Sequence, residues 1–306
     1  MELKSFDEIL EMSRSNTKKS VMAVAGAGSD AVIDAVLDAT DHGFVEPILI
    51  GVPEDIKELL VKYDKNPSDY NIVKTVEGQT SAETAVDIIK AGDADFLMKG
   101  MIETSDLFHP VVKRENGLRT GRTISHVAIY HLPFYHKLLV TTDGGICAYP
   151  DLAKKKDIII NAVEALHLLG YKTPKVAVLC CKETPDKNMP ETLDGQALME
   201  MSQRGELGDC IVVGPISYDL ALSKRRAEIK HYDCPYSGDF DVFLTPNVHA
   251  GNILGKSWEC LPDAEMASYV SGARIPIVLT SRAAPARERL VCIALAGVIA
   301  ERTKSR

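Results

Sequence analysis

Short apolar runs of strand length alternate along this chain with longer segments that have the apolar spacing of a helix. The C-terminal part shows the pattern clearly, because residues 275–279 form an apolar run and apolar side chains recur at helical spacing from Arg287 onward. Repeated strand–helix order predicts a largely parallel sheet with helices on both faces. The fold class we expect is therefore α/β.

The elements that this pattern predicts can be placed along the chain. Strands are expected at 21–25, 46–51, 96–98, 137–142, 175–180, 210–213, 242–244 and 275–279. Helices are expected at 6–12, 30–40, 53–62 and 81–91, and a last one begins at Arg287. Ser81 is predicted to cap the helix over 81–91, with Glu83 in its first turn.

Length and composition favour two domains with aliphatic cores. A chain of 306 residues is long enough for two cores, and its aromatic content of only 6% leaves Val, Ile, Leu and Ala to fill them. Such cores suit buried parallel sheets. No linker or repeat marks a boundary, so topology suggests a first α/β domain of residues 1–136 and 275–306, interrupted by a second α/β domain of residues 137–274.

Charge and cysteine usage limit the class of protein. The formal net charge of −8 argues against binding to nucleic acid or to an anionic membrane. Seven cysteines without a Cys-x-x-Cys pair indicate reduced, mostly buried thiols in a cytoplasmic protein, with Cys180 and Cys181 expected in a core strand. The N-terminus lacks the apolar region of a signal peptide, and no apolar run approaches the roughly 18 residues of a membrane span.

Polar residues follow several predicted strands, at the edge where parallel sheets bind ligands. Lys99 ends one strand and Asp143 follows another. The loop over 117–126 carries Arg119, Thr120, Arg122 and Ser125, so donors outnumber acceptors. Such a loop suits a phosphate or a carboxylate, and a solvated basic turn is the alternative.

The turn over 280–285 joins the last predicted strand to the last helix. It brings hydroxyl, guanidinium and unpaired backbone N–H groups to a helix start, which are the components of an anion site. The alternative is an ordinary strand–helix connection.

Other familiar motifs are weak or missing. Gly26-Ala27-Gly28 follows a strand and opens a helix, but the acidic residue that a dinucleotide site needs after the second strand is missing, which favours a tight turn. No phosphate-binding P-loop, His-Glu-x-x-His or Gly-x-Ser-x-Gly occurs. His126, His131 and His136 are five residues apart and do not share a helical face, so no metal site is expected there.

A set of short segments occurs in order between residues 21 and 296, without large gaps. They are Met98-Lys-Gly100, Gly117-Leu-Arg-Thr-Gly-Arg-Thr123 with Ser125-His126, Thr142-Asp143, Pro150-Asp-Leu152, Asn161-Ala-Val163, Pro174-Lys-Val-Ala177, Met189-Pro190, Met201-Ser, Arg204-Gly, Gly214-Pro215, Pro246-Asn247, Ala250-Gly-Asn-Ile-Leu254 and Pro276-Ile-Val-Leu-Thr-Ser-Arg282. Together they resemble the phosphate acetyl/butyryltransferase family, and its butyryl branch in particular.

This resemblance implies two α/β/α domains of the isocitrate/isopropylmalate dehydrogenase type, with the active site in the cleft between them. It implies transfer of a short-chain acyl group between coenzyme A and inorganic phosphate, with butyryl-CoA or a branched relative favoured. It also implies no metal and no permanently bound cofactor, since coenzyme A is a substrate, and a homodimer or a multiple of dimers.

The resemblance also assigns residues. By residue-to-residue match, Ser281 and Arg282 correspond to the active-site serine and arginine. Glu288 stands seven residues after the serine, where the acetyl branch has an aspartate that deprotonates the coenzyme A thiol. A thiol with a pKa near ~8.5 must lose its proton to attack, and a guanidinium stabilises charge on the carbonyl oxygen. The substrate and phosphate contacts expected are Lys99, Arg119, Thr120, Arg122, Ser125, Asp143 and Asn252.

Some positions depart from the family pattern and leave alternatives open. Ala283-Ala284-Pro285 stands where the butyryl branch often has Ser-Asp-Ser, so Glu288 has the alternative role of a first-turn residue that favours the helix dipole. Gly255 replaces a frequent tyrosine. The rival functions are an NAD-dependent dehydrogenase of the same fold and a non-catalytic homologue that binds coenzyme A or an anion.

Overall fold

The computed structural model describes residues 2–16, 18–280 and 284–305. Its contacts divide the chain into two compact units. The terminal unit comprises Phe6–Gly121 and Ala267–Arg306, and the central unit comprises Met1–Ser5 and Arg122–Met266. The domain division expected from the sequence, with changes at 136–137 and 274–275, stays a prediction.

The terminal unit is built on a mostly parallel sheet. Its strands are β1 (Ser20–Ala25), β2 (Val45–Gly51), β3 (Asn71–Lys74), β4 (Phe96–Lys99), β11 (Ile277–Val278) and, from Ala267 onward, β10 (Glu265–Ser271). They lie in the order β3-β2-β1-β4-β11-β10, and only the β10–β11 pair is antiparallel. The first strand, β1, is therefore central, which is why all but one of its residues are buried.

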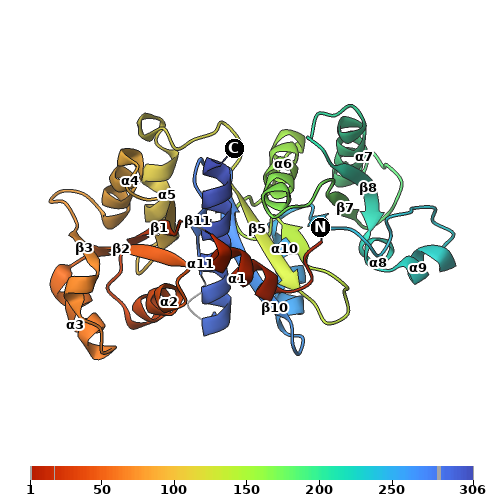
Figure 1. The fold of residues 1–306 in the computed structure, drawn as a ribbon. Coiled ribbons are helices and arrows are strands. Elements are labelled where there is room, and N and C mark those ends of the chain that lie inside the picture. The colour runs from red at the N-terminus through yellow and green to blue at the C-terminus, as the bar shows by residue number, and fades with distance from the viewer. Residues whose placement is uncertain (1, 17, 281–283, 306) are drawn as a thin grey trace. The chain divides into compact units, whose positions relative to one another are not determined.

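Helices cover both faces of this sheet. They are α1 (Phe6–Ser15), α2 (Asp30–Asp41), α3 (Pro53–Lys62), α4 (Ser81–Ala91), α5 (Thr104–Val112) and α11 (Ala286–Lys304), with short 3-10 turns at Pro67–Asp69 and Arg114–Asn116. Figure 1 shows α4 and α5 on the opposite side of β1 and β2 from α2 and α3. Every residue of α11 from Leu290 to Ala300 is buried, because the helix packs against α1, α2 and the strands at once.

The central unit has its own mostly parallel sheet. Its strands are β5 (Ser125–His131), β6 (Leu139–Thr142), β7 (Lys175–Cys180), β8 (Ile211–Ser217) and β9 (Val242–Leu244), in the order β5-β6-β9-β7-β8. Only β5 and β6 run antiparallel. Its helices are α6 (Leu152–Leu168), α7 (Pro190–Gln203), α8 (Tyr218–Leu222), α9 (Lys224–Ile229) and α10 (Val248–Glu259).

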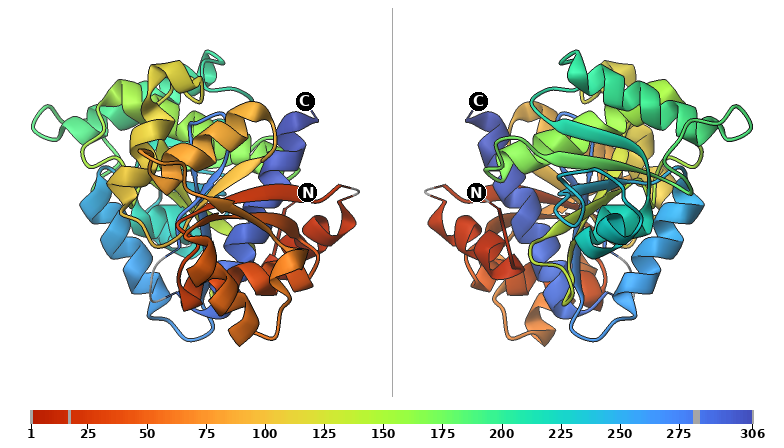
Figure 2. Two further views of the ribbon diagram at one scale, coloured as in Figure 1. Left: turned by 90° about the vertical axis from the view of Figure 1, so that its left-hand side faces the viewer. Right: turned by 90° about the vertical axis from the view of Figure 1, so that its right-hand side faces the viewer.

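One face of the central sheet holds most of the unit's aromatic side chains. The right-hand view of Figure 2 shows α7 on one side of the strands and α8 and α10 on the other. On the α10 side, the Trp258 ring meets the Tyr130 ring edge-on, with centroids 5.1 Å apart, and lies 6.3 Å from the Phe243 ring. All three side chains are buried, so α10 is held rigidly against β5 and β9.

The expected α/β class is confirmed, and several expected boundaries need correction. Strand β5 occupies part of the segment expected to be a loop, and β3 and β10 were not predicted. The helix over 81–91 is capped by Thr80 and not by Ser81, because the Thr80 hydroxyl accepts from the Glu83 N–H at 3.2 Å while the Glu83 carboxylate accepts from the Thr80 N–H at 3.0 Å. That reciprocal pair is a capping box, which places Ser81 inside the helix.

The cysteines are free, but most of them are not buried. Only Cys210 and Cys292 are fully buried, whereas Cys181 and Cys260 are exposed and the other three are half-buried. The expectation of mostly buried thiols was therefore wrong. Cys180 is the last residue of β7, paired with Ser217 of β8, and Cys181 lies beyond the end of the strand. None of the helices formed by the described residues is long and apolar enough to cross a membrane.

A buried lysine joins the amino ends of three strands in the central unit. The side chain of Lys137 is fully buried, and its Nζ lies 2.6 Å from Asp241 Oδ1 and 2.9 Å from Asp239 Oδ1. Asp241 precedes β9, and its other oxygen accepts from the Lys175 N–H of β7 at 2.7 Å. One potential ligand atom from each of Glu2, His136 and Asp239 also lies here, and these atoms are within 4.8 Å of one another, as in a metal site. The Lys137 ammonium already contacts two of these carboxylates, so it supplies the cation.

Replacing Lys137 with Met should lower the free energy of unfolding by about 3–5 kcal/mol, because the buried Asp241 carboxylate loses its cation. Urea unfolding measures the change. Lys256→Met is the matched control, since its ion pair with Glu259 is exposed and is worth less than about 1 kcal/mol. Equal losses in the two variants would contradict this account.

Candidate functional site

The carboxyl ends of the parallel strands in the central unit meet at one edge of its sheet. Asp143 follows β6, Cys181 follows β7, Tyr218 follows β8 and Thr245 follows β9. Ligands of open α/β sheets bind beyond this edge. The candidate site is therefore built from the turns that leave these strands.

The carboxylate of Asp143 organises the turn after β6. Only 2% of the residue is exposed. Its Oδ1 accepts from the N–H groups of Gly145 at 2.7 Å and Ile146 at 2.8 Å, and its Oδ2 accepts from those of Cys147 at 3.2 Å and His126 at 3.0 Å. Four backbone donors occupy this one carboxylate. Asp143 thus holds the turn against β5 and has little capacity left for a ligand.

The start of α10 packs directly on that turn. A Cβ added to Gly251 would lie 2.7 Å from the Asp143 carbonyl oxygen and 2.8 Å from Gly144 Cα, so only glycine fits this approach. Asn252, the next residue, is exposed, and its amide donates to the Gly144 carbonyl at 3.2 Å. The Asn247 side chain caps α10 by accepting from the Ala250 N–H at 3.1 Å. The turn and the helix start therefore form one rigid element.

His126 lies beside the same turn. A Cβ added to Gly145 would lie 3.3 Å from His126 Nδ1, so the imidazole ring covers the glycine. Burial lowers the pKa of His126, and the nearby Asp143 charge opposes that shift without reversing it. This shift favours the neutral form of the ring. From the sequence, no metal site was expected at this histidine, which was placed among the ordered segments without an assigned role.

The part of the predicted anion loop that lies in the central unit is attached to α6. Arg122 Nη1 pairs with Glu164 Oε1 at 2.6 Å. The N–H and the hydroxyl of Thr123 both donate to Asp157. Ser125 is fully buried, and its hydroxyl accepts from the Asn161 amide at 2.8 Å. These contacts fix the path of the loop.

The remaining predicted residues that the structure describes lie in the terminal unit. Lys99 ends β4, with its Nζ 3.4 Å from the Gly100 carbonyl oxygen. Arg119 and Thr120 are exposed. The backbone of Arg119 forms an isolated antiparallel β-bridge with Ala273, and the Thr120 hydroxyl donates to the Gly272 carbonyl at 2.5 Å. The structure thus brings Arg119 and Thr120 to the segment that precedes β11.

The glycine turn after β1 is a closed structural turn, as predicted. The N–H groups of Gly26 and Ala27 both donate to the Ile50 carbonyl, at 3.0 and 2.9 Å, and the Met101 N–H donates to the Gly26 carbonyl at 2.8 Å. A Cβ on Gly100 would overlap the Gly26 oxygen. The turn therefore has no spare N–H groups at Gly26 and Ala27 for a pyrophosphate.

Ser281 and Arg282 lie outside the described residues. Glu288 is half-buried in the first turn of α11. Burial raises the pKa of the Cys292 thiol, one turn further on, to about 12, and the Glu288 charge adds to this shift. The Arg289 guanidinium donates to the Ala284 carbonyl at 2.6 Å and to the Asp34 carboxylate at 3.0 Å. These hydrogen bonds fix the start of the helix.

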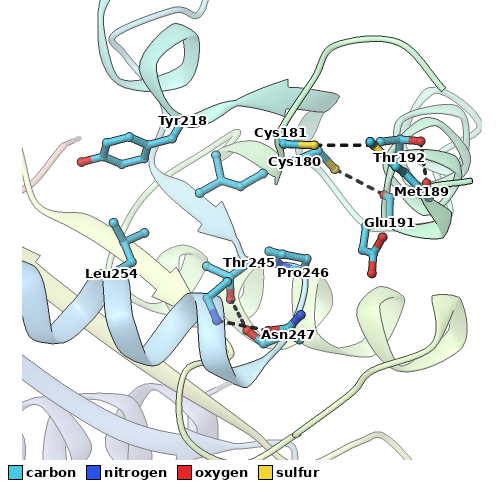
Figure 3. Close-up of a pocket in the computed structure, with 12 residues that line it drawn as sticks. Cys180, Cys181, Met189, Glu191, Thr192, Tyr218, Thr245, Pro246, Asn247 and Leu254 are labelled. Carbon is cyan, nitrogen blue, oxygen red and sulfur yellow. Dashed lines mark hydrogen bonds between the residues drawn. The ribbon is translucent and has the colours of Figure 1, made fainter. Parts of the chain in front are cut away.

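A pocket of about 410 Å³ opens at the carboxyl edge of the central sheet. Figure 3 shows Tyr218 and Leu254 at one end and Met189, Glu191 and Thr192 at the other. Cys180 and Cys181 at the end of β7 and the segment Thr245–Pro246–Asn247 after β9 complete the lining, with Leu179 and Ala250. The sequence reasoning did not predict this pocket. Its signal in the sequence was that Met189-Pro190, Pro246-Asn247 and Ala250-Gly-Asn-Ile-Leu254 belong to the ordered segments.

An apolar pocket of this size at the carboxyl edge of parallel strands is typical of α/β proteins that bind small molecules. A family model described as "Phosphate acetyl/butaryl transferase" matches residues 71–297. A phosphate butyryltransferase of Clostridium acetobutylicum is 37% identical over 298 residues, which cover 97% of this chain and 99% of the relative. A phosphate acetyltransferase of Thermotoga maritima is 36% identical and covers 96% of this chain and 99% of its own.

A solved structure agrees with these relatives. The branched-chain phosphotransacylase from Enterococcus faecalis superposes with a TM-score of 0.79 and 26% identity, covering 92% of this chain and 99% of that one. The chain belongs to the phosphate acetyl/butyryltransferase family. It is an enzyme of the phosphate acyltransferase class, with coenzyme A among its substrates.

Replacing Asp143 with Asn should lower the free energy of unfolding by about 3 kcal/mol, because one amide oxygen cannot accept from four N–H groups and the amide NH₂ faces donors. Urea unfolding measures the loss, and acyl transfer should fall with it. Asp151→Asn is the control, since Asp151 caps α6 through one N–H and Asn caps a helix equally well. A loss no larger than in Asp151→Asn would refute the organising role of Asp143.

Proposed function

We propose that this enzyme transfers a short-chain acyl group according to acyl-CoA + phosphate ⇌ acyl phosphate + CoA, with butyryl-CoA or a branched relative preferred. The observation that carries the preference is the similarity, over nearly the whole chain, to a phosphate butyryltransferase. The apolar pocket at the carboxyl edge of the central sheet supports it, because a hydrocarbon chain needs such a surface.

The proposed chemistry rests on three residues. Glu288 takes the proton from the coenzyme A thiol, so that the thiolate attacks the carbonyl carbon of the acyl phosphate. Arg282 stabilises the negative charge that develops on the carbonyl oxygen, and Ser281 orients the thiol or the leaving phosphate. In the opposite direction phosphate attacks the thioester and the thiolate leaves. Correct placement of the two substrates contributes much of the rate.

The proposed binding residues fall into two groups. Lys99, Arg119, Thr120, Arg122 and Asn252 are proposed to contact phosphate groups or the polar part of coenzyme A. Ser125 and Asp143 are buried and engaged by the protein, so we assign them positioning roles.

Other parts of the expectation remain predictions. These are the isocitrate/isopropylmalate dehydrogenase-like form of the two domains, the active site in a cleft between them, the homodimer or multiple of dimers, and the cytoplasmic location. Free cysteines are consistent with a reducing compartment. The similarity to phosphate acyltransferases over nearly the whole chain favours acyl transfer over the dehydrogenase alternative.

The transfer itself is tested by release of free thiol from a panel of acyl-CoAs with and without inorganic phosphate. We expect phosphate-dependent release, and a loss of about 10²–10³-fold in kcat for Ser281→Ala and Arg282→Ala. Arg287→Ala is the control, because Arg287 is exposed and pairs with Asp7. Release that needs no phosphate would identify a thioesterase. Unchanged turnover in both variants would show that the assignment of Ser281 and Arg282 is wrong.

The role of Glu288 is tested by the pH dependence of the reaction between coenzyme A and acyl phosphate. Glu288→Gln should slow the reaction by about 10²-fold at pH 7. The rate of the variant should approach that of wild type as the pH rises towards the pKa of the coenzyme A thiol, since the thiol then ionises without help. Glu301→Gln, on the same helix, is the control. Parallel pH profiles for wild type and Glu288→Gln would leave Glu288 as a helix-dipole residue.

A further inference from the structure

The wall of the pocket in the central unit contains polar residues, among them Glu191, and several of their polar groups are hydrogen-bonded within the protein. The Thr192 hydroxyl donates to the Met189 carbonyl at 2.7 Å and accepts from the Asp186 N–H at 2.8 Å. The Asn247 side-chain oxygen accepts from the Ala250 N–H. The Tyr218 hydroxyl accepts from the Trp258 indole N–H at 3.1 Å. Much of the surface offered to a ligand is therefore apolar.

The two ends of the pocket differ in rigidity. At one end the Tyr218 ring lies 6.0 Å from Phe243 and 6.4 Å from Trp258, ring centre to ring centre, and is fixed by both. Leu254, on the second turn of α10, faces the same end (Figure 3). The other end has Met189 and Cys181, whose sulfur atoms lie 3.6 Å apart and whose side chains adapt to different shapes.

We propose that this pocket receives the hydrocarbon chain of the acyl group, and that Leu254 with Tyr218 sets the longest chain accepted. The proposal rests on the acyl transfer proposed above and specifies where its substrate class is selected. A pantetheine arm has two amide groups that would need partners, and the engaged side chains provide few. A saturated chain needs none. The volume exceeds that of a butyryl group, so branched or longer chains also fit.

The first test measures kcat/KM with acetyl-, butyryl-, isobutyryl-, hexanoyl- and octanoyl-CoA for variants of Leu254. Leu254→Ala enlarges the end beside Tyr218, so the octanoyl-to-butyryl ratio of kcat/KM should rise at least tenfold. Leu254→Phe shortens the pocket, so activity with hexanoyl-CoA should fall at least tenfold relative to acetyl-CoA. Ile253→Ala is the matched control, because Ile253 is 69% exposed on the same helix. A uniform change at every chain length would overturn the proposal.

The second test reads binding without turnover. Cys181 is an exposed thiol in the pocket wall, whereas Cys260, at the end of α10, is exposed outside it. N-ethylmaleimide adds the thiol across its double bond with no leaving group, and mass spectrometry follows each cysteine. Without phosphate, acyl-CoAs should protect Cys181 increasingly from acetyl to hexanoyl and leave Cys260 unaffected. Burial raises the pKa of Cys180 to about 12, so Cys180 should react slowly.

The outcomes of the two tests separate the two proposals. Protection of Cys181 that grows with chain length, without phosphate-dependent thiol release, would uphold the acyl pocket and refute the transfer reaction. Phosphate-dependent release with equal protection by every acyl-CoA would uphold the transfer and refute the acyl pocket, since the pantetheine arm would then occupy it. The absence of any protection would likewise refute the acyl pocket.

Discussion

The candidate site depends on one buried carboxylate. Asp143 is placed at the end of β6 by the strand register, and it gathers four N–H groups from the following turn and from β5. A buried charge is tolerated only when such donors replace its water. Because the turn is closed in this way, glycine backbone at 144 and 251 can meet and α10 can start beside it. The position of Asn252 and of one pocket wall follows from that contact.

Charge is arranged differently at the two edges of the central sheet. At the amino edge, Lys137 and its carboxylates neutralise one another and join strand starts. At the carboxyl edge, many polar groups are bonded to backbone and leave an apolar hollow. The Lys137 cluster is therefore separated from the pocket by the length of the strands, whereas the Asp143 charge at the carboxyl edge is held by backbone N–H groups.

Much of the secondary structure was predictable because it depends on local patterns. The helices over 53–62 and 81–91 and the strands over 175–180 and 242–244 begin and end where the residue pattern placed them. Strand β5 was missed, because its first residues read as a polar loop and only pairing with β6 and burial of Ser125 against Asn161 make it a strand. The Thr80 cap was missed by one residue, since either hydroxyl fits the sequence pattern.

The sequence by itself determined the α/β class, the order of most elements and, through an ordered series of short segments, the acyltransferase family. These depend on periodicity and residue identity, which are local properties. Only the tertiary structure decided that Ser125 and Asp143 are engaged inside the protein and that Cys181, Tyr218 and Leu254 line one pocket. Those facts depend on contacts between residues far apart in the chain, and strand pairing and helix packing create such contacts only when the whole unit folds.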